Sequence, residues 1–126
     1  MEERRDGGVL TLFGVRRQVD EIGRITIPSE FRALLKLHPR SGVAYSGIGI
    51  PGFGQGVFVF ATNEKVESGR RIDYLGRFTI PFRMCNTYMI EKRKWVELVP
   101  ICHEELGYGL FVHRVNSDCV VEDTEA

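Results

Sequence analysis

A nine-residue string occurs twice in the chain, 53 residues apart, and this repeat strongly limits the folds available to it. Asp-Glu-Ile-Gly-Arg-Ile-Thr-Ile-Pro occupies residues 20–28 and Asp-Tyr-Leu-Gly-Arg-Phe-Thr-Ile-Pro occupies residues 73–81, with six of the nine positions identical. The same offset continues without a gap and superposes Arg17 on Arg70, Val43 on Val96, Gly54 on Gly107 and Phe58 on Phe111. An ungapped register over about forty residues predicts the duplication of one structural unit.

Each copy of this unit is predicted to contain two strands, a short helix and two further strands. The Asp-x-x-Gly turn separates the first two strands, since Asp accepts hydrogen bonds from nearby backbone amides and Gly tolerates positive φ. Proline ends the second strand, and Ser29 is a suitable N-cap for a helix over 30–37. The expected apolar helix faces are Phe31, Leu34 and Leu35 in the first copy and Phe82, Cys85 and Met89 in the second. The expected strands are 9–19 (interrupted at Gly14), 24–27, 43–50, 57–62, 95–101 and 109–115.

The small size of one copy constrains the architecture further. A unit of about fifty residues is near the lower limit for independent stability, and its short strands would leave exposed edges. We therefore expect a mainly β fold, a closed or nearly closed β-barrel of two ββαββ repeats with pseudo-two-fold symmetry and two flanking helices. The repeats extend over 1–63 and 64–115. A tail over 116–126 is acidic, with Asp118, Glu122, Asp123 and Glu125.

The distribution of charge is more informative than its total. The chain of 126 residues has 17 Lys and Arg and 17 Asp and Glu, so its formal net charge is zero and it is not a uniformly basic nucleic-acid binder. The bases are concentrated around the repeated string, with six against three acids over 14–40 and seven against two over 69–94. Arginine predominates, and its planar fork suits phosphate oxygens and guanine edges. The sequence thus predicts a local basic surface.

No complete catalytic or metal site is evident. The three cysteines are odd in number and lack Cys-x-x-Cys spacing, which argues against a disulfide framework or zinc site. Residues 47–52 match G-x-G-x-x-G, but no helix pattern follows, so a hairpin loop with an exposed Phe53 is the better interpretation. The run 102–105, Cys-His-Glu-Glu, lacks a second ligand pair. We expect no enzyme, cofactor or metal and, without a run of ~20 apolar residues, a cytoplasmic protein.

The segment 14–32 contains Val-Asp-x-x-Gly-Arg-x-x-Ile-Pro-x-x-x-Arg and resembles the AbrB-type swapped-hairpin domain. That superfamily includes AbrB-like and SpoVT-like transition-state regulators, MazE-type antitoxins and MraZ proteins. The second copy matches the motif through Asp73, Gly76, Arg77, Ile80 and Pro81. The resemblance implies an interleaved swapped-hairpin β-barrel. It also implies a bacterial, nucleoid-associated regulator of transcription that binds double-stranded DNA.

The resemblance also implies which residues contact DNA. They are Arg17, Arg24 and Arg32 in the first copy and Arg70, Arg77 and Arg83 in the second. Arg83 is included as the base nearest to Cys85, which stands at the position equivalent to Arg32. Because the second copy lacks this third arginine, we expect Arg24→Ala to weaken DNA binding more than Arg77→Ala. The structural turns are expected to depend on Asp20, Gly23, Asp73 and Gly76.

Two alternatives to a DNA-binding regulator stay open. A MazE-like antitoxin would bind a toxin, although the eleven residues after Val115 are few for a toxin-binding segment. An MraZ-like protein would assemble its chains into a ring, although copies in such proteins are usually further apart than the 53 residues seen here. Solution mass and DNA binding over a salt series distinguish a monomer, a homo-oligomer and a protein that does not bind DNA.

Overall fold

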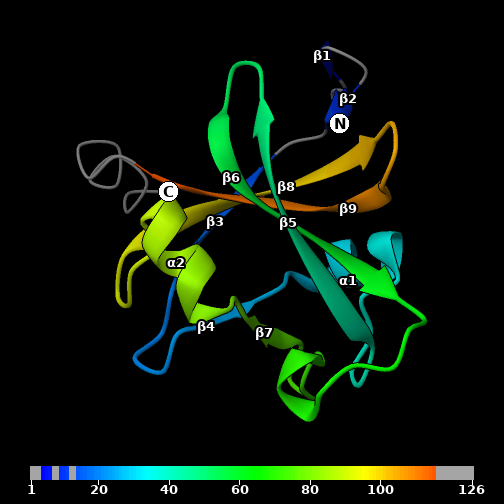
Figure 1. The fold of residues 1–126 in the computed structure, drawn as a ribbon, viewed down its shortest axis with the longest axis vertical. Helices are drawn as coiled ribbons and strands as arrows, with labels where there is room; N and C mark the ends of the chain where they lie inside the picture. The colour runs from blue at the N-terminus through cyan, green and yellow to red at the C-terminus, as the bar shows by residue number, and fades with distance from the viewer. Residues whose placement is uncertain (1–3, 7–8, 12–13, 116–126) are drawn as a thin grey trace.

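The computed structural model describes residues 4–6, 9–11 and 14–115 of the chain. In chain order, the elements are β1 (Arg4–Asp6), β2 (Val9–Thr11), β3 (Val15–Gln18), β4 (Arg24–Thr26), α1 (Ser29–Leu35), β5 (Gly42–Ile50), β6 (Gly54–Thr62), the 3-10 helix η1 (Ser68–Arg70), β7 (Arg77–Thr79), α2 (Phe82–Tyr88), β8 (Trp95–His103) and β9 (Gly107–Arg114) (Figure 1). The fold is mainly β, as predicted, and β1 lies outside the strands that the sequence indicated. The elements β4, α1, β5 and β6 each begin 53 residues before β7, α2, β8 and β9.

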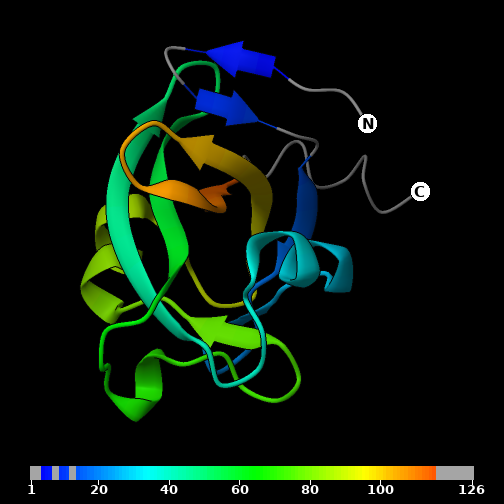
Figure 2. The ribbon, with the colours of Figure 1, turned by 90° about the vertical axis from the view of Figure 1, so that its right-hand side faces the viewer.

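The strands form two antiparallel sheets. Seven strands make the larger sheet, in the order β1-β2-β8-β9-β6-β5, with β3 also paired to β8; β4 and β7 make the smaller one. Figure 2 shows the β4–β7 sheet at the end of the molecule opposite to the β1–β2 hairpin. The described strands do not close into a barrel, so the expectation of a closed barrel is wrong. Among the described strands, β4 and β7, with three residues each, pair only with one another and do not continue the larger ladder.

Each copy pairs its first segment with the other copy. In the first copy, β3 lies antiparallel to β8 of the second, with Gln18 opposite Trp95. The equivalent pair, Arg71 and Gly42, forms an isolated bridge from the second copy to the first. These pairings are reciprocal, so neither copy completes its strand pairing alone.

Two pairs of equivalent residues locate the axis that relates the copies. Ile25 lies opposite Phe78 in the β4–β7 ladder, and Phe58 lies opposite Phe111 in the β6–β9 ladder. The members of each pair are 53 residues apart in the sequence. Equivalent residues that face one another directly in an antiparallel ladder have a local two-fold axis between them. The pseudo-two-fold axis therefore passes through both ladders.

The first strand predicted for the second copy does not form as a strand. Its place is taken by η1 and the single bridge at Arg71. The equivalent strand of the first copy begins with the β-branched Val15, whereas η1 begins with Ser68 and Gly69, which favour a strand less. The predicted order of strand, strand, helix, strand, strand is therefore complete only in the first copy.

Both helices begin directly after a proline and contain seven residues. Pro28 and Pro81 occupy the N-cap positions without a side-chain hydrogen bond. The prediction that Ser29 is the N-cap is therefore wrong, since Ser29 is the first helical residue and the fixed φ of proline already sets the chain's entry into the helix. The helix α1 buries Phe31 and Leu35 but leaves Leu34 half exposed.

The face that α2 turns to the core differs from the predicted one. Phe82 is 78% exposed and Met89 is 54% exposed, so of the predicted face only Cys85 is directed inward. Phe82 is equivalent to Ser29, which is also exposed, so the shared backbone places this position in solvent despite its apolar side chain. The residues of α2 that pack against the core are Met84, Cys85 and Tyr88.

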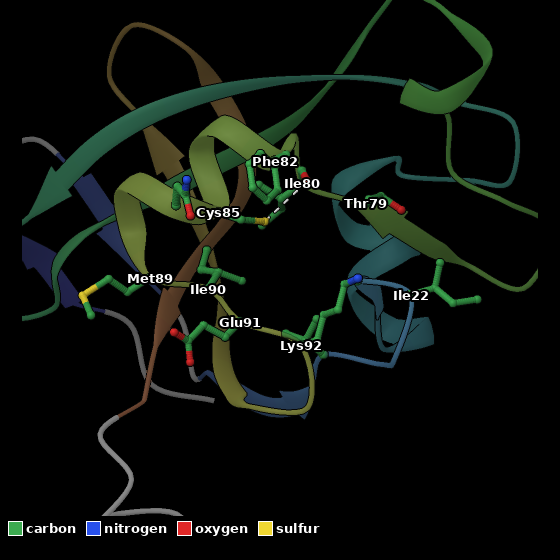
Figure 3. Close-up of a pocket in the computed structure, with 12 residues that line it drawn as sticks. Ile22, Thr79, Ile80, Phe82, Cys85, Met89, Ile90, Glu91 and Lys92 are labelled. Carbon is green, nitrogen blue, oxygen red and sulfur yellow. Dashed lines mark hydrogen bonds between the residues drawn. The ribbon is translucent and has the colours of Figure 1, made fainter.

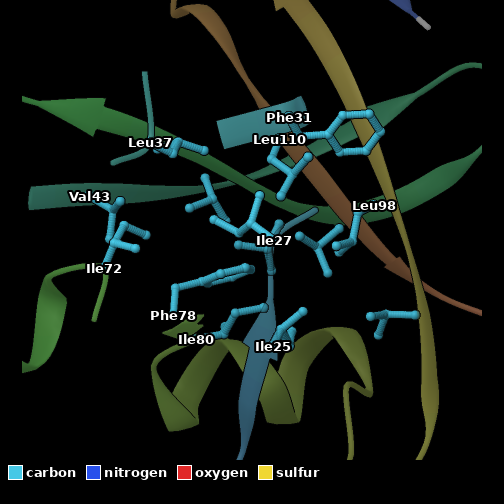
Figure 4. Close-up of a cluster of buried hydrophobic side chains, with 14 of the residues drawn as sticks. Ile25, Ile27, Phe31, Leu37, Val43, Ile72, Phe78, Ile80, Leu98 and Leu110 are labelled. Atoms are coloured by element: carbon cyan, nitrogen blue, oxygen red, sulfur yellow. The ribbon is translucent and has the colours of Figure 1, made fainter. Parts of the chain in front are cut away.

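The main core lies between the larger sheet and a layer formed by the β4–β7 sheet and the helices (Figure 4). Its members come from both copies and include Ile25, Ile27, Phe31, Val43, Ile72, Phe78, Ile80, Leu98 and Leu110. A second cluster consists of Ile50, Phe58, Val99, Ile101 and Phe111. Phe53 packs against it, with its ring centroid 6.3 Å from that of Phe111, so the expectation of an exposed Phe53 is wrong. Aromatic packing holds this ring on the protein instead of in solvent.

Some expectations lie outside the described residues, among them the acidic tail 116–126. Within residues 4–6, 9–11 and 14–115, no helix is long and apolar enough to cross a membrane. The same ranges contain no group of three or more His, Cys, Asp or Glu residues placed to hold a metal ion. Cys85 and Cys102 are free thiols.

Candidate nucleic-acid interface

The two repeated turns have the same hydrogen bonds. In the first copy, Asp20 Oδ1 accepts hydrogen bonds from the amides two and four residues further on, at 2.9 and 2.7 Å. In the second copy, Asp73 Oδ1 accepts the equivalent bonds at 3.0 and 2.8 Å. Gly23 and Gly76 have φ of 93° and 81°, the left-handed conformation that the sequence predicted at both turns. Each turn thus leads into its following strand with the same geometry.

The same aspartates also orient the first arginine of that strand. Arg24 Nε donates to Asp20 Oδ2 at 2.8 Å, and Arg77 Nε donates to Asp73 Oδ2 at 2.7 Å. The arginine side chains are 31% and 23% exposed. Among the residues that the structure describes, no hydrogen bond engages the Nη groups of either arginine. These groups are therefore held in position and available to an external acceptor.

Both aspartates are ionised at neutral pH. Burial favours the neutral carboxyl, but the backbone and side-chain hydrogen bonds from the following arginine outweigh it. The pKa of Asp20 and the pKa of Asp73 therefore lie below the ordinary value. Each carboxylate compensates part of one arginine's charge, so the pair supplies a fixed hydrogen-bond donor rather than a strong excess of positive charge.

The outward side of the small sheet presents both arginines together. Ile25 is buried, and because side chains alternate along a strand, Arg24 and Thr26 point away from the core. In the register of the ladder, Arg24 lies opposite Thr79 and Thr26 lies opposite Arg77. These four outward residues define the β4–β7 face. The two arginines are diagonal neighbours, about 7–8 Å apart at their Cα atoms.

Arg32 of α1 lies against the turn of the other copy. A side chain at Gly76 would collide with its guanidinium. The Nε of Arg32 is buried and has no hydrogen-bond partner in the described part of the chain. Because Gly76 directly precedes Arg77, this predicted DNA contact borders the β4–β7 face beside the second copy's arginine, not beside Arg24.

Arg70 of the second copy borders the β4–β7 face and lies over the ring of Tyr45 from the first copy. Its guanidinium carbon lies 5.8 Å from the centroid of the Tyr45 ring, a cation–π distance. The hydroxyl of Tyr45 donates to the carbonyl of Thr79 at 2.8 Å, and burial raises the pKa of Tyr45 to about 12. A shallow pocket lies between η1 and the end of β7, and Arg70 and Thr79 are among the residues that line it. Arg70 is thus placed next to the face by a neutral tyrosine.

The two other predicted arginines are less closely tied to this face. Arg17, half-buried in β3, donates from Nη1 to the carbonyl of Arg16 at 3.0 Å. Arg83 is exposed on α2, where its carbonyl accepts a hydrogen bond from Thr87. No hydrogen bond joins either side chain to the β4–β7 face among the described residues. The structure therefore brings together four of the six predicted arginines.

Sequence reasoning missed the residues that complete the face. Thr26 and Thr79 are exposed and identical in the two copies, so alternation from the arginines was sufficient to find them. Tyr45 carried no such signal, because its equivalent in the second copy is Leu98. The neighbouring turns also expose Tyr74, which alternation could not place because it lies in a turn.

Comparison with known proteins gives no relative from which a function could be transferred: no family model matches the chain, and no curated protein and no solved structure is significantly similar to it. The geometry of the β4–β7 face is therefore the basis for assigning a function.

Proposed function

We propose that the chain is a transcription regulator that binds double-stranded DNA through the β4–β7 face. The observation that carries this proposal is the symmetric presentation of Arg24 and Arg77 by two equivalent aspartates. Each guanidinium is oriented through Nε and keeps its Nη groups for an external acceptor. Planar N–H donors held in advance lose little conformational entropy on binding phosphate oxygens or a guanine edge.

The spacing of the two arginines fits one duplex. Their separation of about 7–8 Å corresponds to about two base-pair steps of 3.4 Å. Thr26 and Thr79 lie opposite Arg77 and Arg24 in the ladder, and their hydroxyls are further donors suited to phosphate oxygens. Arg32 and Arg70 extend the basic surface on its two borders. Because the face has a pseudo-two-fold axis, it would bind with that axis aligned to a local two-fold axis of the duplex.

The proposed fold family is the AbrB-type swapped-hairpin superfamily, with two copies fused in one chain. The reciprocal pairing of β3 with β8 and of Arg71 with Gly42 supports this assignment, because each copy then exchanges its first segment with the other. In this proposal the single chain replaces a dimer of one-copy chains. A regulator of this kind would act at the bacterial nucleoid.

Binding of random duplex DNA over a series of NaCl concentrations tests the proposal. We expect the affinity of the wild-type protein to fall steeply with salt, because bound phosphates release counterions. The Arg24→Ala/Arg77→Ala variant should bind at least about tenfold more weakly, with a salt slope smaller by about two. Arg114→Ala, which removes an exposed arginine from the end of β9, is the matched control and should bind like the wild type.

If the double variant keeps the wild-type affinity and salt slope, with an unchanged melting temperature, the proposal that DNA binds through this face is contradicted. Co-purification with a small basic protein would then favour the MazE-like alternative. A solution mass of many chains would favour the MraZ-like one.

A further inference from the structure

A groove of about 590 Å³ lies between the 20–23 turn and α2 (Figure 3). Its wall is mostly apolar and includes Val19, Ile22, Ile80, Phe82, Met89 and Ile90. Three of these side chains, Ile22, Phe82 and Met89, are more than half exposed. Large apolar side chains exposed around a concave surface of this size are typical of a ligand site.

The difference between the copies at the position of Arg32 and Cys85 contributes to this groove. In the first copy, Arg32 extends from α1 over the turn at Gly76 and fills the equivalent space. In the second copy, that position is Cys85, whose short side chain remains on α2 with its Sγ 3.5 Å from the carbonyl oxygen of Ile80. The atom nearest to a side chain placed on Gly23 is the Cε of Lys92, 4.0 Å away. The turn at Gly23 is therefore left uncovered.

One lysine, Lys92, lines this mostly apolar groove, together with Thr79, Asn86 and Glu91. At its rim, Arg114 Nη1 donates to Met89 Sδ at 3.4 Å. Figure 3 shows the side chain of Lys92 extending toward the turn that carries Ile22, while the carboxylate of Glu91 is directed to the other side. Among the residues that the structure describes, no carboxylate forms an ion pair with Lys92. A mostly apolar wall with an ammonium that no carboxylate of the described residues pairs is complementary to a ligand with an apolar body and one negative charge.

We propose that this groove binds a small amphipathic carboxylate. Its aliphatic chain would lie against Ile80, Cys85 and Ile90, and its carboxylate would bind the ammonium of Lys92. Phe82 and Met89 would lose exposed apolar surface when the ligand is bound, which contributes to affinity. This site does not depend on the proposed DNA-binding function, and its test contains no DNA.

Octanoate is the probe, titrated into protein carrying ¹³C-methyl methionine and followed by NMR. The methyl signal of Met89, which lines the groove, should shift with a Kd on the order of 1 mM. The signal of Met84, which packs against the core, is the internal control and should not move. Octan-1-ol has the same chain without the charge and should bind more weakly. No shift of Met89 up to about 10 mM octanoate, or equal binding of octan-1-ol, overturns the proposal.

Substitutions then test the two features of the site. Cys85→Arg places in the second copy the residue that fills the equivalent space in the first, and should abolish the Met89 shift. Lys92→Gln should weaken octanoate binding about three- to fivefold, whereas Lys94→Gln, which removes a neighbouring charge outside the groove, should not change it.

Phe82→Ser is the second variant and keeps the proposal testable if Cys85→Arg fails to fold. It introduces the residue of the first copy at a position that is already exposed, so the fold should be retained. It should weaken binding several-fold through lost apolar contact. Wild-type octanoate affinity in both Phe82→Ser and Lys92→Gln contradicts this site.

Discussion

The turns at Gly23 and Gly76 have the same hydrogen bonds and similar φ values, yet their surroundings differ. Arg32 covers the turn of the second copy, whereas Cys85 leaves the turn of the first copy open beside a groove. The exchange of Arg32 for Cys85 between equivalent helix positions therefore contributes to the difference between a packed turn and an exposed one. The duplicated backbone fixes where residues lie, while individual side chains decide what each surface can bind.

The two copies are expected to be most alike near the axis, and glycine substitutions there should have the largest effect. A methyl group on Gly109 would lie 2.5 Å from the Phe58 ring and 2.7 Å from the carbonyl oxygen of Val59. One on the equivalent Gly56 would lie 2.9 Å from the Phe111 ring and would collide with the carbonyl oxygen of Val112. Gly56→Ala and Gly109→Ala should each lower the free energy of unfolding by about 2–3 kcal/mol, measured by urea denaturation.

Gly69→Ala is the control for these two variants, because within the described part of the chain no atom other than those of its chain neighbours lies within 4 Å of the new methyl group. Its effect should stay within about 0.5 kcal/mol. If Gly56→Ala and Gly109→Ala differ from each other by more than about 1.5 kcal/mol, the two copies do not contribute equally at the axis.

The two proposed DNA contacts, Arg24 and Arg77, differ in their surroundings, and the position of Arg32 favours the opposite order of effects to the one expected from the sequence. From the sequence, Arg24→Ala is expected to have the stronger effect, because Arg32 belongs to the same copy as Arg24. In the structure, however, the guanidinium of Arg32 lies beside Gly76 and hence near Arg77. Arg77→Ala should therefore weaken DNA binding more than Arg24→Ala, with losses of about 1–3 kcal/mol for an arginine that reads a base. Anisotropy titrations of both variants on one duplex measure the difference. A larger loss for Arg24→Ala would show that Arg32 does not assist its neighbour.

The sequence predicted the elements that depend on local chemistry. The repeat, the strand pattern and the two Asp-x-x-Gly turns follow from residue spacing, and both glycines have the predicted positive φ. Contacts between the copies could not be predicted, because the position of Arg32 on the turn of the other copy depends on how the copies pair. The exposed face of α2 was also missed, since Phe82 is placed by the backbone and not by its hydrophobicity.

The third comparison is between the two long hairpins and involves pH. In the second copy, His113 Nε2 and Glu97 Oε1 are 2.8 Å apart, whereas the equivalent first-copy residues are Phe60 and Ala44. The hydrogen bond with His113 outweighs burial and lowers the pKa of Glu97 below its ordinary value of 4.5. The stability from Glu97 is therefore present above pH 4.5 and is lost as the pH falls through the lower folded-state pKa.

Glu97→Gln should cost about 1 kcal/mol at pH 7 and should make the loss of stability in acid less steep. Part of that loss should remain, because Asp20 and Asp73 also have lowered pKa values. Melting temperatures from pH 7 to pH 3 measure the effect, with the exposed Glu105→Gln as control. If the melting temperature of Glu97→Gln falls with pH as that of the wild type does, the Glu97–His113 pair does not contribute to the loss of stability in acid.

We expect the two copies to form one structure in which neither is complete alone. Residues 1–63, prepared as a separate fragment, test this claim directly by light scattering and thermal unfolding. Because β2 and β3 pair with β8, β4 pairs with β7 and β6 pairs with β9, the fragment lacks a partner for four of its strands. We predict that it is unfolded, or folds only as a self-associated species in which a second fragment supplies those partners. A monomeric fragment with a cooperative melting transition would contradict the account.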